Sequence, residues 1–330
     1  MPHSSLQSLT TITAFGAYVP ERVLTNHDLE QMVDTSDEWI FQRTGIKERR
    51  IAADDQFCSD MCFGAVRDLQ LRYGVVLDDV DYIIVATTTP DTFFPSMSAR
   101  VQAEFGITSC GAVDIQAACA GFVAALQMAN GLLLSGVYHK ILVIGAETLS
   151  KATDYTDRTT CILFGDGAGA ALLERDDDGA FLASYSATNG EDGRHLYRSS
   201  LASTINGQPI QGNGLIVQNG REVYKWAVTT VPKGIKTLLD DSGYTVDEIT
   251  WFVPHSANLR IVESICDRTG IPLERTLTSM KQYGNTSAAS IPLALDLAIK
   301  EGRIASGDTI LLYGFGGGLT ESALLLRWTL

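Results

Sequence analysis

The chain has 330 residues, 45% of them hydrophobic, and a formal net charge of -14. This length and composition are ample for a large core and predict two domains or one large fused domain. The acidic balance argues against general nucleic-acid binding, which needs a basic surface field. Every run of 18 residues contains a charged or turn-forming residue, so we expect no membrane span.

The cysteines, the histidines and the N-terminal segment narrow the class further. The six cysteines form no C-x-x-C pair, and the five histidines show no metal-ligand spacing such as H-E-x-x-H. The first residues lack a basic region followed by an apolar one, so we expect no secretion signal. These features favour a reduced cytoplasmic enzyme without a metal over a disulfide scaffold or a zinc protein.

Helix-like and strand-like segments alternate along the first half, which is typical of an α/β fold. Strands are expected where apolar residues form short continuous runs, and helices where apolar residues recur with a period near 3.6. In chain order we expect a helix at 61–74, strands at 80–89 and 111–118, a helix at 120–136, a strand at 139–147 and a polar loop to about 158.

The second half repeats the order of the first. The segment 231–258 resembles the segment 64–89: each has a helix, two acidic residues between apolar ones, and a strand with an aromatic residue. The block "FGDGAGAALLE" from Phe164 likewise resembles "FGGGLTESALLL" from Phe315, and each reads as a glycine turn leading into an apolar strand. Two matches in the same order predict a duplicated α/β unit rather than chance repetition.

A charged turn at 174–180 is the expected join between the two halves. It divides the chain into an N-terminal half, 1–176, and a C-terminal half, 177–330. Within the second half, residues 186–214 are polar and rich in Gly, Asn and Ser. We expect a long excursion there, and long loops on a compact scaffold often cover a site.

The two glycine blocks are poor candidates for nucleotide binding. A dinucleotide fingerprint needs a strand, then G-x-G-x-x-G, then a helix, whereas both blocks lead into strand-like runs. Neither block ends in the G-K-[ST] of a P-loop. We expect left-handed turns and close backbone approach instead. The N–H groups of residues 316–318 could face a substrate oxygen.

Cys119 lies in "IQAACAGF", between small residues and just ahead of a long apolar helix. A thiol at a helix start interacts with the positive end of the helix dipole, so we expect a lowered pKa and a reactive thiolate. A buried structural cysteine is the alternative, and a lone cysteine would favour it.

Two further polar residues follow apparent strand ends. His255 comes after an apolar strand and a proline in "WFVPHSAN", and Asn285 lies in "YGNTSAAS" ahead of a helix start. Together with Cys119 they suffice for two reaction classes. One is a papain-like hydrolase. The other is acyl transfer followed by carbon–carbon bond formation, with His and Asn donating hydrogen bonds to an enolate. Spacing alone does not choose between the two.

At these residues the chain closely resembles the 3-oxoacyl-[acyl-carrier-protein] synthase III family. The resemblance runs through nearly the whole chain, by way of "TSDEWIFQRTGIKERRIA", "ACAGF", "TDRTTCILFGDGAGA", "PHSANLRI", "GNTSAASIP" and "FGGGLTESALL". It implies the thiolase fold, in which duplicated α/β halves form five layers (αβαβα). It also implies a homodimer and the reaction that initiates type II fatty acid synthesis.

The resemblance implies a role for each polar residue. Cys119 would take a short acyl group from acyl-CoA. His255 and Asn285 would support decarboxylation of malonyl-acyl carrier protein and hold the resulting enolate. The N–H groups of Cys119 and Gly317 would form the oxyanion hole. CoA thioesters are then substrates, and no cofactor is expected.

The resemblance also implies three sets of binding residues. The CoA contacts would be Thr35, Trp39, Arg43, Arg158 and Asn258. The acidic carrier protein would dock on Lys225, Arg260 and Arg268, because an acidic chain needs a local basic patch for an acidic partner. Asp267 departs from the Lys of some relatives and puts the size of that patch in doubt. The acyl pocket would use Leu149, Phe164, Phe315 and, from the partner subunit, Phe94.

Three other functions remain open at this point. A related condensing enzyme of a specialised pathway would share all the catalytic residues and differ in starter or acceptor. A non-catalytic partner of a condensing enzyme is disfavoured by the intact Cys119, His255 and Asn285. A cysteine hydrolase would cleave thioesters without forming a carbon–carbon bond. The primer is also open, because each methylene changes specificity by only about 1–3 kcal/mol.

Overall fold

The computed structural model describes residues 6–330, and its first sheet is built from the N-terminal half. The strand order is β1-β7-β6-β4-β5. β4 runs parallel to β5 and β6, whereas β7 runs antiparallel to β1 and β6. The strands are β1 Thr10–Tyr18, β4 Tyr82–Ala86, β5 Gly111–Ile115, β6 Lys140–Thr148 and β7 Asp166–Arg175.

The second sheet has the order β13-β14-β15-β8. β13 is parallel to β14, and the other two pairs are antiparallel. This repeats the β4-β6-β7-β1 part of the first sheet in both order and direction, which confirms the predicted duplication. The proposed boundary after Asp176 lies in the turn between β7 and β8. The strands are β8 Phe181–Thr188, β13 Trp251–Pro254, β14 Thr309–Gly316 and β15 Thr320–Arg327.

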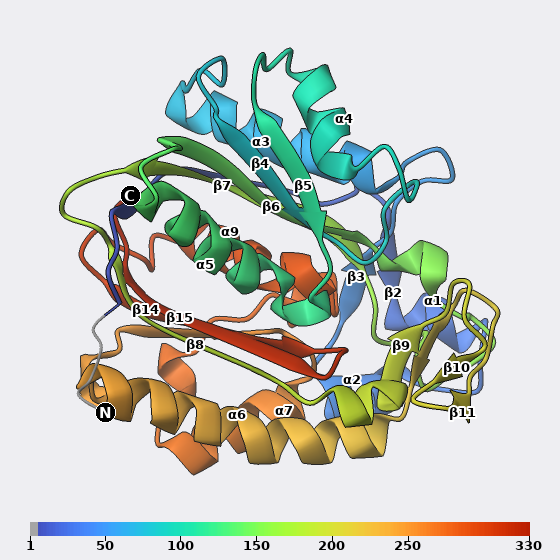
Figure 1. Cartoon of the computed structure of the whole chain (residues 1–330). Coiled ribbons are helices and arrows are strands. Elements are labelled where there is room, and N and C mark those ends of the chain that lie inside the picture. Colours follow the sequence, from blue (N-terminus) through green and yellow to red (C-terminus); the bar gives the residue numbers. More distant parts are fainter. Residues whose placement is uncertain (1–5) are drawn as a thin grey trace.

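Helices and sheets alternate in five layers (Figure 1). α3 and α4 cover the outer face of the first sheet, α5 and α9 lie between the sheets, and α6 and α7 cover the outer face of the second. The bounds are α3 Cys58–Tyr73, α4 Met97–Glu104, α5 Gly121–Leu134, α6 Gly220–Ser242, α7 Leu259–Thr269 and α9 Ser290–Lys300.

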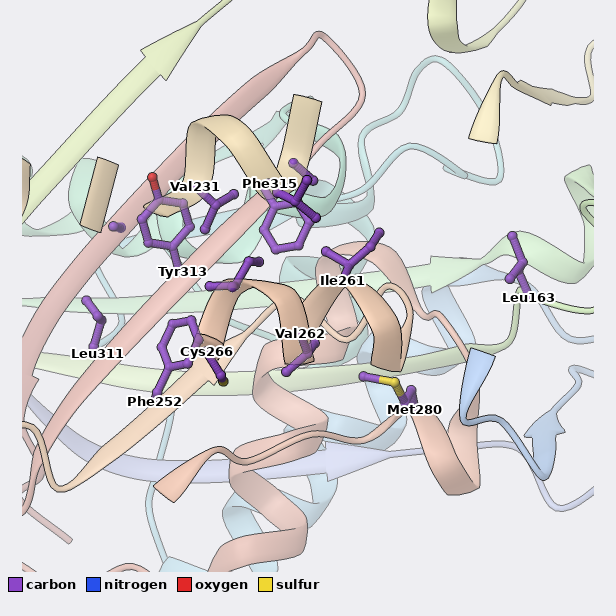
Figure 2. Packing of buried hydrophobic residues seen from close by; sticks show 14 of the residues in the cluster. Leu163, Val231, Phe252, Ile261, Val262, Cys266, Met280, Leu311, Tyr313 and Phe315 are labelled. Carbon is purple, nitrogen blue, oxygen red and sulfur yellow. The ribbon is translucent and has the colours of Figure 1, made fainter. Parts of the chain in front are cut away.

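The hydrophobicity of each helix matches its layer. α5 is apolar around most of its circumference ("GFVAALQMANGLLL"), which suits a helix covered by sheets on two sides. α6 is amphipathic and buries one face only. Figure 2 shows the outer core of the second half, in which Val231 of α6 and Val262 of α7 pack over Tyr313 and Phe315 of β14.

Smaller elements gather at one end of the two sheets (Figure 1). They include three two-stranded sheets, β2-β3, β9-β12 and β10-β11. The excursion expected at 186–214 begins only after residue 188, because residues 186–188 still belong to β8. The elements are β2 Val23–Thr25, α1 Asn26–Glu30, α2 Asp37–Thr44, β3 Glu48–Arg50, β9 Leu196–Arg198, β10 Thr204–Ile205, β11 Gln208–Pro209, β12 Ile216–Gln218 and α8 Met280–Tyr283. In residues 6–330 no helix combines the length and hydropathy needed to cross a bilayer.

Two sequence-based expectations about backbone are corrected by the structure. The strand expected at 80–89 ends at Ala86, because the next three threonines leave the sheet and bond to Glu147. The first glycine block is not a left-handed turn. Gly167 and Gly169 lie inside β7, where a Cβ on Gly169 would come within 2.3 Å of Pro292 of α9. Close helix–strand packing is therefore what requires glycine there.

Candidate active site

A cavity of about 770 Å³ opens where the two halves meet, and it contains all three proposed catalytic residues. Cys119 comes from the first half, whereas His255 and Asn285 come from the second. Residues 196–198 of the long excursion also line the cavity, so this part of the excursion covers the site. The site therefore exists only when the halves pack together.

Cys119 lies in a 3₁₀ turn, Ala118–Ala120, between the end of β5 and the start of α5. The turn begins with Ala118 in a left-handed conformation (φ 43°), which is unusual for a residue other than glycine. The side chain of Cys119 is 9% exposed. A Cβ on Gly316 would lie 2.8 Å from its sulfur, so glycine is needed to leave room at the nucleophile.

Burial raises the pKa of the Cys119 thiol to about 12. Hydrogen bonds from the Ser287 side chain and from the N–H groups of Cys119 and Gly317 act in the opposite direction. The predicted lowering of this pKa is therefore wrong, because desolvation outweighs these donors. The sulfur also lies ahead of the α-helix proper, which begins at Gly121. At neutral pH the residue is a thiol.

His255 follows β13 and is 1% exposed. Its backbone N–H donates to the Tyr313 carbonyl oxygen at 2.8 Å, and the ring nitrogen Nδ1 lies 2.7 Å from Ser290 Oγ. The ring packs edge-on against Phe315, with centroids 5.3 Å apart. Burial lowers the pKa of His255 to about 3, so the imidazole is neutral and its other nitrogen, Nε2, is left for the cavity.

Asn285 is held by backbone pairing with the first half. Its N–H donates to Leu163 O at 2.8 Å, and its carbonyl accepts from Gly165 N at 3.0 Å. Its side-chain Oδ1 accepts from Ser287 N at 2.9 Å. The amide NH₂ is therefore oriented away from this turn, as a donor for the cavity.

The outer part of the cavity is aromatic and basic. The Trp39 ring lies under two guanidinium groups, with Arg43 Cζ at 4.4 Å and Arg158 Cζ at 5.3 Å from its centroid. Arg158 is positioned by a 2.9 Å hydrogen bond to Asp34 O. Asn258 caps α7 by accepting from Arg260 N. An aromatic face beside two cations suits a nucleotide base with attached phosphates.

The inner part of the cavity is apolar. Leu149, Phe164 and Phe315 all line it and are at most 5% exposed. Phe315 also belongs to the outer core of the second half (Figure 2), so its ring is fixed by packing rather than free to move. The three positions predicted for an acyl pocket within one chain thus lie together.

Comparison with known proteins places the chain in a family. The family model described as 3-Oxoacyl-[acyl-carrier-protein (ACP)] synthase III matches residues 113–190, and the model of its C-terminal part matches residues 239–328. "Beta-ketoacyl-[acyl-carrier-protein] synthase III 2" of Halalkalibacterium halodurans is 60% identical over 323 residues, covering 98% of this chain and 97% of the relative. The chain belongs to the 3-oxoacyl-[acyl-carrier-protein] synthase III family.

Other relatives agree with synthase III membership. The protein of the same name from Bacillus subtilis is 59% identical over 322 residues, which is 97% of this chain and 99% of the relative. The crystal structure of the Thermus thermophilus synthase III superposes with a TM-score of 0.93 at 46% identity, covering 96% of this chain and 99% of the other. These findings confirm the thiolase fold and a condensing acyltransferase, and they support the fatty-acid hypothesis over the specialised one.

Four of the residues expected to bind substrates in a synthase III lie outside the cavity lining. Thr35 precedes α2, and its buried Oγ1 has no hydrogen-bond partner among the described residues. Phe94 is 87% exposed at a loop tip, so it does not line its own chain's pocket. Lys225 on α6 and Arg268 on α7 are exposed, as is Arg260, which reaches the edge of the cavity.

Sequence reasoning missed several buried polar residues of the site. Ser287 interacts with the sulfur of Cys119, and Ser290 contacts the ring of His255. Glu147 is a fully buried carboxyl next to them. The signal was present: a glutamate ends the apolar run "ILVIGAE", and two serines three residues apart follow Asn285. Within residues 6–330 no group of three His, Cys, Asp or Glu side chains could hold a metal ion.

Proposed function

We propose that this synthase III primes fatty acid synthesis by moving a short acyl group from acyl-CoA to Cys119. The acyl group then condenses with malonyl-acyl carrier protein to give 3-oxoacyl-carrier protein, CO₂ and CoA. The observation that carries this proposal is the meeting of Cys119, His255 and Asn285 in one cavity with an apolar inner part and a basic aromatic mouth.

In the acylation step the Cys119 sulfur attacks the thioester carbonyl of acyl-CoA. The carbonyl oxygen gains negative charge, and the N–H groups of Cys119 and Gly317 stabilise it. Both N–H groups act on the Cys119 sulfur and lower its pKa, which supports their convergence at this point. Fixed backbone donors of this kind stabilise a developing oxyanion without reorganisation.

In the condensation step the malonyl group loses CO₂, and the electrons of the broken bond form a thioester enolate. His255 and Asn285 donate hydrogen bonds to the enolate oxygen. Its carbon then attacks the acyl carbonyl on Cys119 and releases the sulfur. A neutral imidazole supports this role, because the pKa of His255, lowered to about 3, keeps it from becoming a cation that would hold the carboxylate.

The binding residues complete the proposal. CoA would stack on Trp39 between Arg43 and Arg158, with Thr35 and Asn258 as further contacts. The carrier protein would dock on the exposed cations Lys225, Arg260 and Arg268. Leu149, Phe164 and Phe315 would hold the acyl group, and Phe94 of the partner subunit would close the pocket in a cytoplasmic homodimer.

A primer competition tests the function. The enzyme is mixed with malonyl-carrier protein and acetyl-, isobutyryl-, isovaleryl- and longer acyl-CoAs, and the products are weighed by mass spectrometry. We expect 3-oxoacyl-carrier protein formed from short primers. Acylation of Cys119 without condensation, or condensation with a long acyl group only, would contradict the proposal. Trp39→Ala is expected to raise KM for acyl-CoA by about tenfold at unchanged kcat, as loss of one stacked base would.

A further inference from the structure

Glu147 is a buried carboxyl that the proposed reaction does not use. It is the last residue but one of β6 and is 0% exposed. Its oxygens accept from Thr88 N at 3.1 Å, Thr88 Oγ1 at 2.9 Å and Thr89 Oγ1 at 2.6 Å. Burying a carboxyl this deep costs free energy because burial penalises its charged form, and these hydrogen bonds offset part of that cost.

Ser287 lies between this carboxyl and the nucleophile. Hydrogen bonding by the Ser287 hydroxyl lowers the pKa of both Glu147 and Cys119, and its turn packs against both the Cys119 turn and β6. Its backbone is held in a left-handed conformation (φ 47°), and its N–H bonds to Asn285 Oδ1. The turn packs directly on β6, where a Cβ on Gly145 would come within 2.5 Å of Ala288 O. Ser287, Cys119 and Thr88 all line the same cavity.

A hydroxyl in this position can take one proton while it gives another. We propose that Glu147, acting through Ser287, accepts the proton that the Cys119 thiol loses when its sulfur attacks an acyl thioester. This inference rests on the acyl transfer proposed above. Cys119 is the catalytic residue, Ser287 contacts its reacting sulfur, and Glu147 acts through Ser287.

The proton and electron pairs balance in this step. The S–H proton of Cys119 moves to Ser287 Oγ as the Ser287 proton moves to the Glu147 carboxylate. The sulfur pair forms a bond to the thioester carbon, and the bond from that carbon to the CoA sulfur breaks. The proton then returns through Ser287 to the leaving CoA sulfur, so CoA leaves as a thiol and the carboxylate is restored.

The titration of the three groups supports this assignment. Cys119 is a thiol at neutral pH because burial raises its pKa to about 12. His255 is a poor acceptor, since burial lowers its pKa to about 3. Burial raises the pKa of Glu147, which makes its carboxylate a better base than an exposed one.

The groups that face Glu147 from neighbouring elements leave it available for this role. Cys58 of α3 reaches it through Thr87, and a hydrogen bond with Cys62, together with burial, raises the pKa of that thiol. Asp166 of β7 bonds instead to Ser150 and to Ala52 N, while the Arg198 guanidinium bonds to the Thr88 carbonyl. None of these interactions neutralises the Glu147 carboxylate.

Glu147→Gln distinguishes proton acceptance from a purely electrostatic effect of the Glu147 charge, because the two predict opposite changes in the reactivity of the Cys119 thiol. The charge of Glu147 raises the pKa of Cys119, so its removal alone would make the thiol more reactive at pH 7. Loss of the proton acceptor makes it less reactive. We expect alkylation of Cys119 by iodoacetamide, followed by peptide mass, to slow at least about tenfold at pH 7. An equal or faster rate would overturn the inference.

The pH profile supplies a second readout that a merely structural role would not change. In the wild type the alkylation rate should fall as pH drops through the raised pKa of Glu147 and level off above it. In Glu147→Gln this plateau should vanish, and the rate should keep rising toward the pKa of the thiol. Glu321→Gln is the matched control, because Glu321 is also buried (2% exposed) and bonds to Tyr hydroxyls.

Ser287→Ala tests the relay if Glu147→Gln does not fold. It should also lose the plateau, and the double variant should lose no more than either single variant. A wild-type profile in Ser287→Ala would overturn the inference. Alkylation needs no acyl-CoA, so it tests the proton path independently of the proposed function. If the variants lost the plateau but no acyl-CoA acylated the wild type, the proposed function would be refuted and the proton path would remain supported.

Discussion

Two turns of the same backbone shape meet in the cavity, one from each half of the chain. Ala118–Ala120 and Ser287–Ala289 are both 3₁₀ turns, both begin with a left-handed residue, and both lead directly into a central helix. Cys119 occupies the second position of the first turn, and Ala288 occupies that position in the second. Duplication thus supplied one geometry twice, whereas the chemistry differs between the copies.

The difference extends to the residue after each turn. Gly121 opens α5, where a Cβ would lie 2.9 Å from the Cβ of Ala86. Ser290 opens α9 and holds the ring of His255 by its hydroxyl. The first turn carries the nucleophile and is followed by a glycine that packs closely against β4. The second turn is followed by a serine that positions the hydrogen-bond donor His255. Changes at matched positions of the two turns can therefore break or sharpen this comparison.

Cys119→Ala makes the first turn chemically like the second and should have the largest effect. We expect no acyl mass adduct with acyl-CoA and a loss of condensation of at least about a thousandfold. Ala288→Cys in the same chain should not restore the adduct, because residue 288 is 1% exposed and its Cβ is packed against Gly121 at the start of α5. An adduct on the cysteine introduced at position 288 would show that the two turns are interchangeable.

His255→Ala and Asn285→Ala change only the catalytic residues that the C-terminal half contributes to the cavity. Each variant should keep acylation of Cys119 and lose condensation by about 10²–10⁴-fold, the usual worth of a positioned donor. Single-turnover mass spectrometry separates the two steps. Condensation at the wild-type rate in either variant would refute this division of labour.

The buried neutral His255 should make stability depend on pH. Its pKa is about 3 in the folded chain and near 6.5 when unfolded, so the unfolded state binds more protons between these values. Stability from this group is present above pH 6.5 and is lost as pH falls toward 3. Between pH 7 and pH 5 the loss is about 2 kcal/mol.

Urea unfolding of the wild type and His255→Gln at both pH values measures this loss. Titration of other groups contributes equally to both proteins, so the difference isolates His255. Equal pH dependence in the two proteins would mean that His255 becomes protonated in the folded state.

Ser290→Ala should have the smallest effect of these four predictions. It removes the 2.7 Å contact at His255 Nδ1 and leaves the ring less well positioned. We expect kcat for condensation to fall about tenfold, equivalent to one lost hydrogen bond, with acylation of Cys119 unchanged. If acylation fell as much as condensation, Ser290 would be stabilising the fold rather than positioning the histidine.

Much of the fold and the candidate site could be predicted from local patterns. Repeated helix–strand order and the two glycine blocks indicated the duplication, and Cys119, His255 and Asn285 stood out at strand ends. The local signal for Glu147 and Ser287 was present but unspecific, because a glutamate after an apolar run and a serine among small residues are mostly exposed in proteins. Only the tertiary structure shows that Glu147 and Ser287 are buried near the sulfur of Cys119, which makes them candidates for a role in the reaction.

The amino-acid sequence by itself determined the alternation of elements, the family, and which side chains are able to do chemistry. The tertiary structure decided the protonation state of those side chains. Cys119 was expected to be a thiolate and is a thiol, because desolvation depends on how completely the two halves close around it. It also decided which residues meet, since positions 119, 147, 255 and 285 come together only when two sheets enclose the central helices.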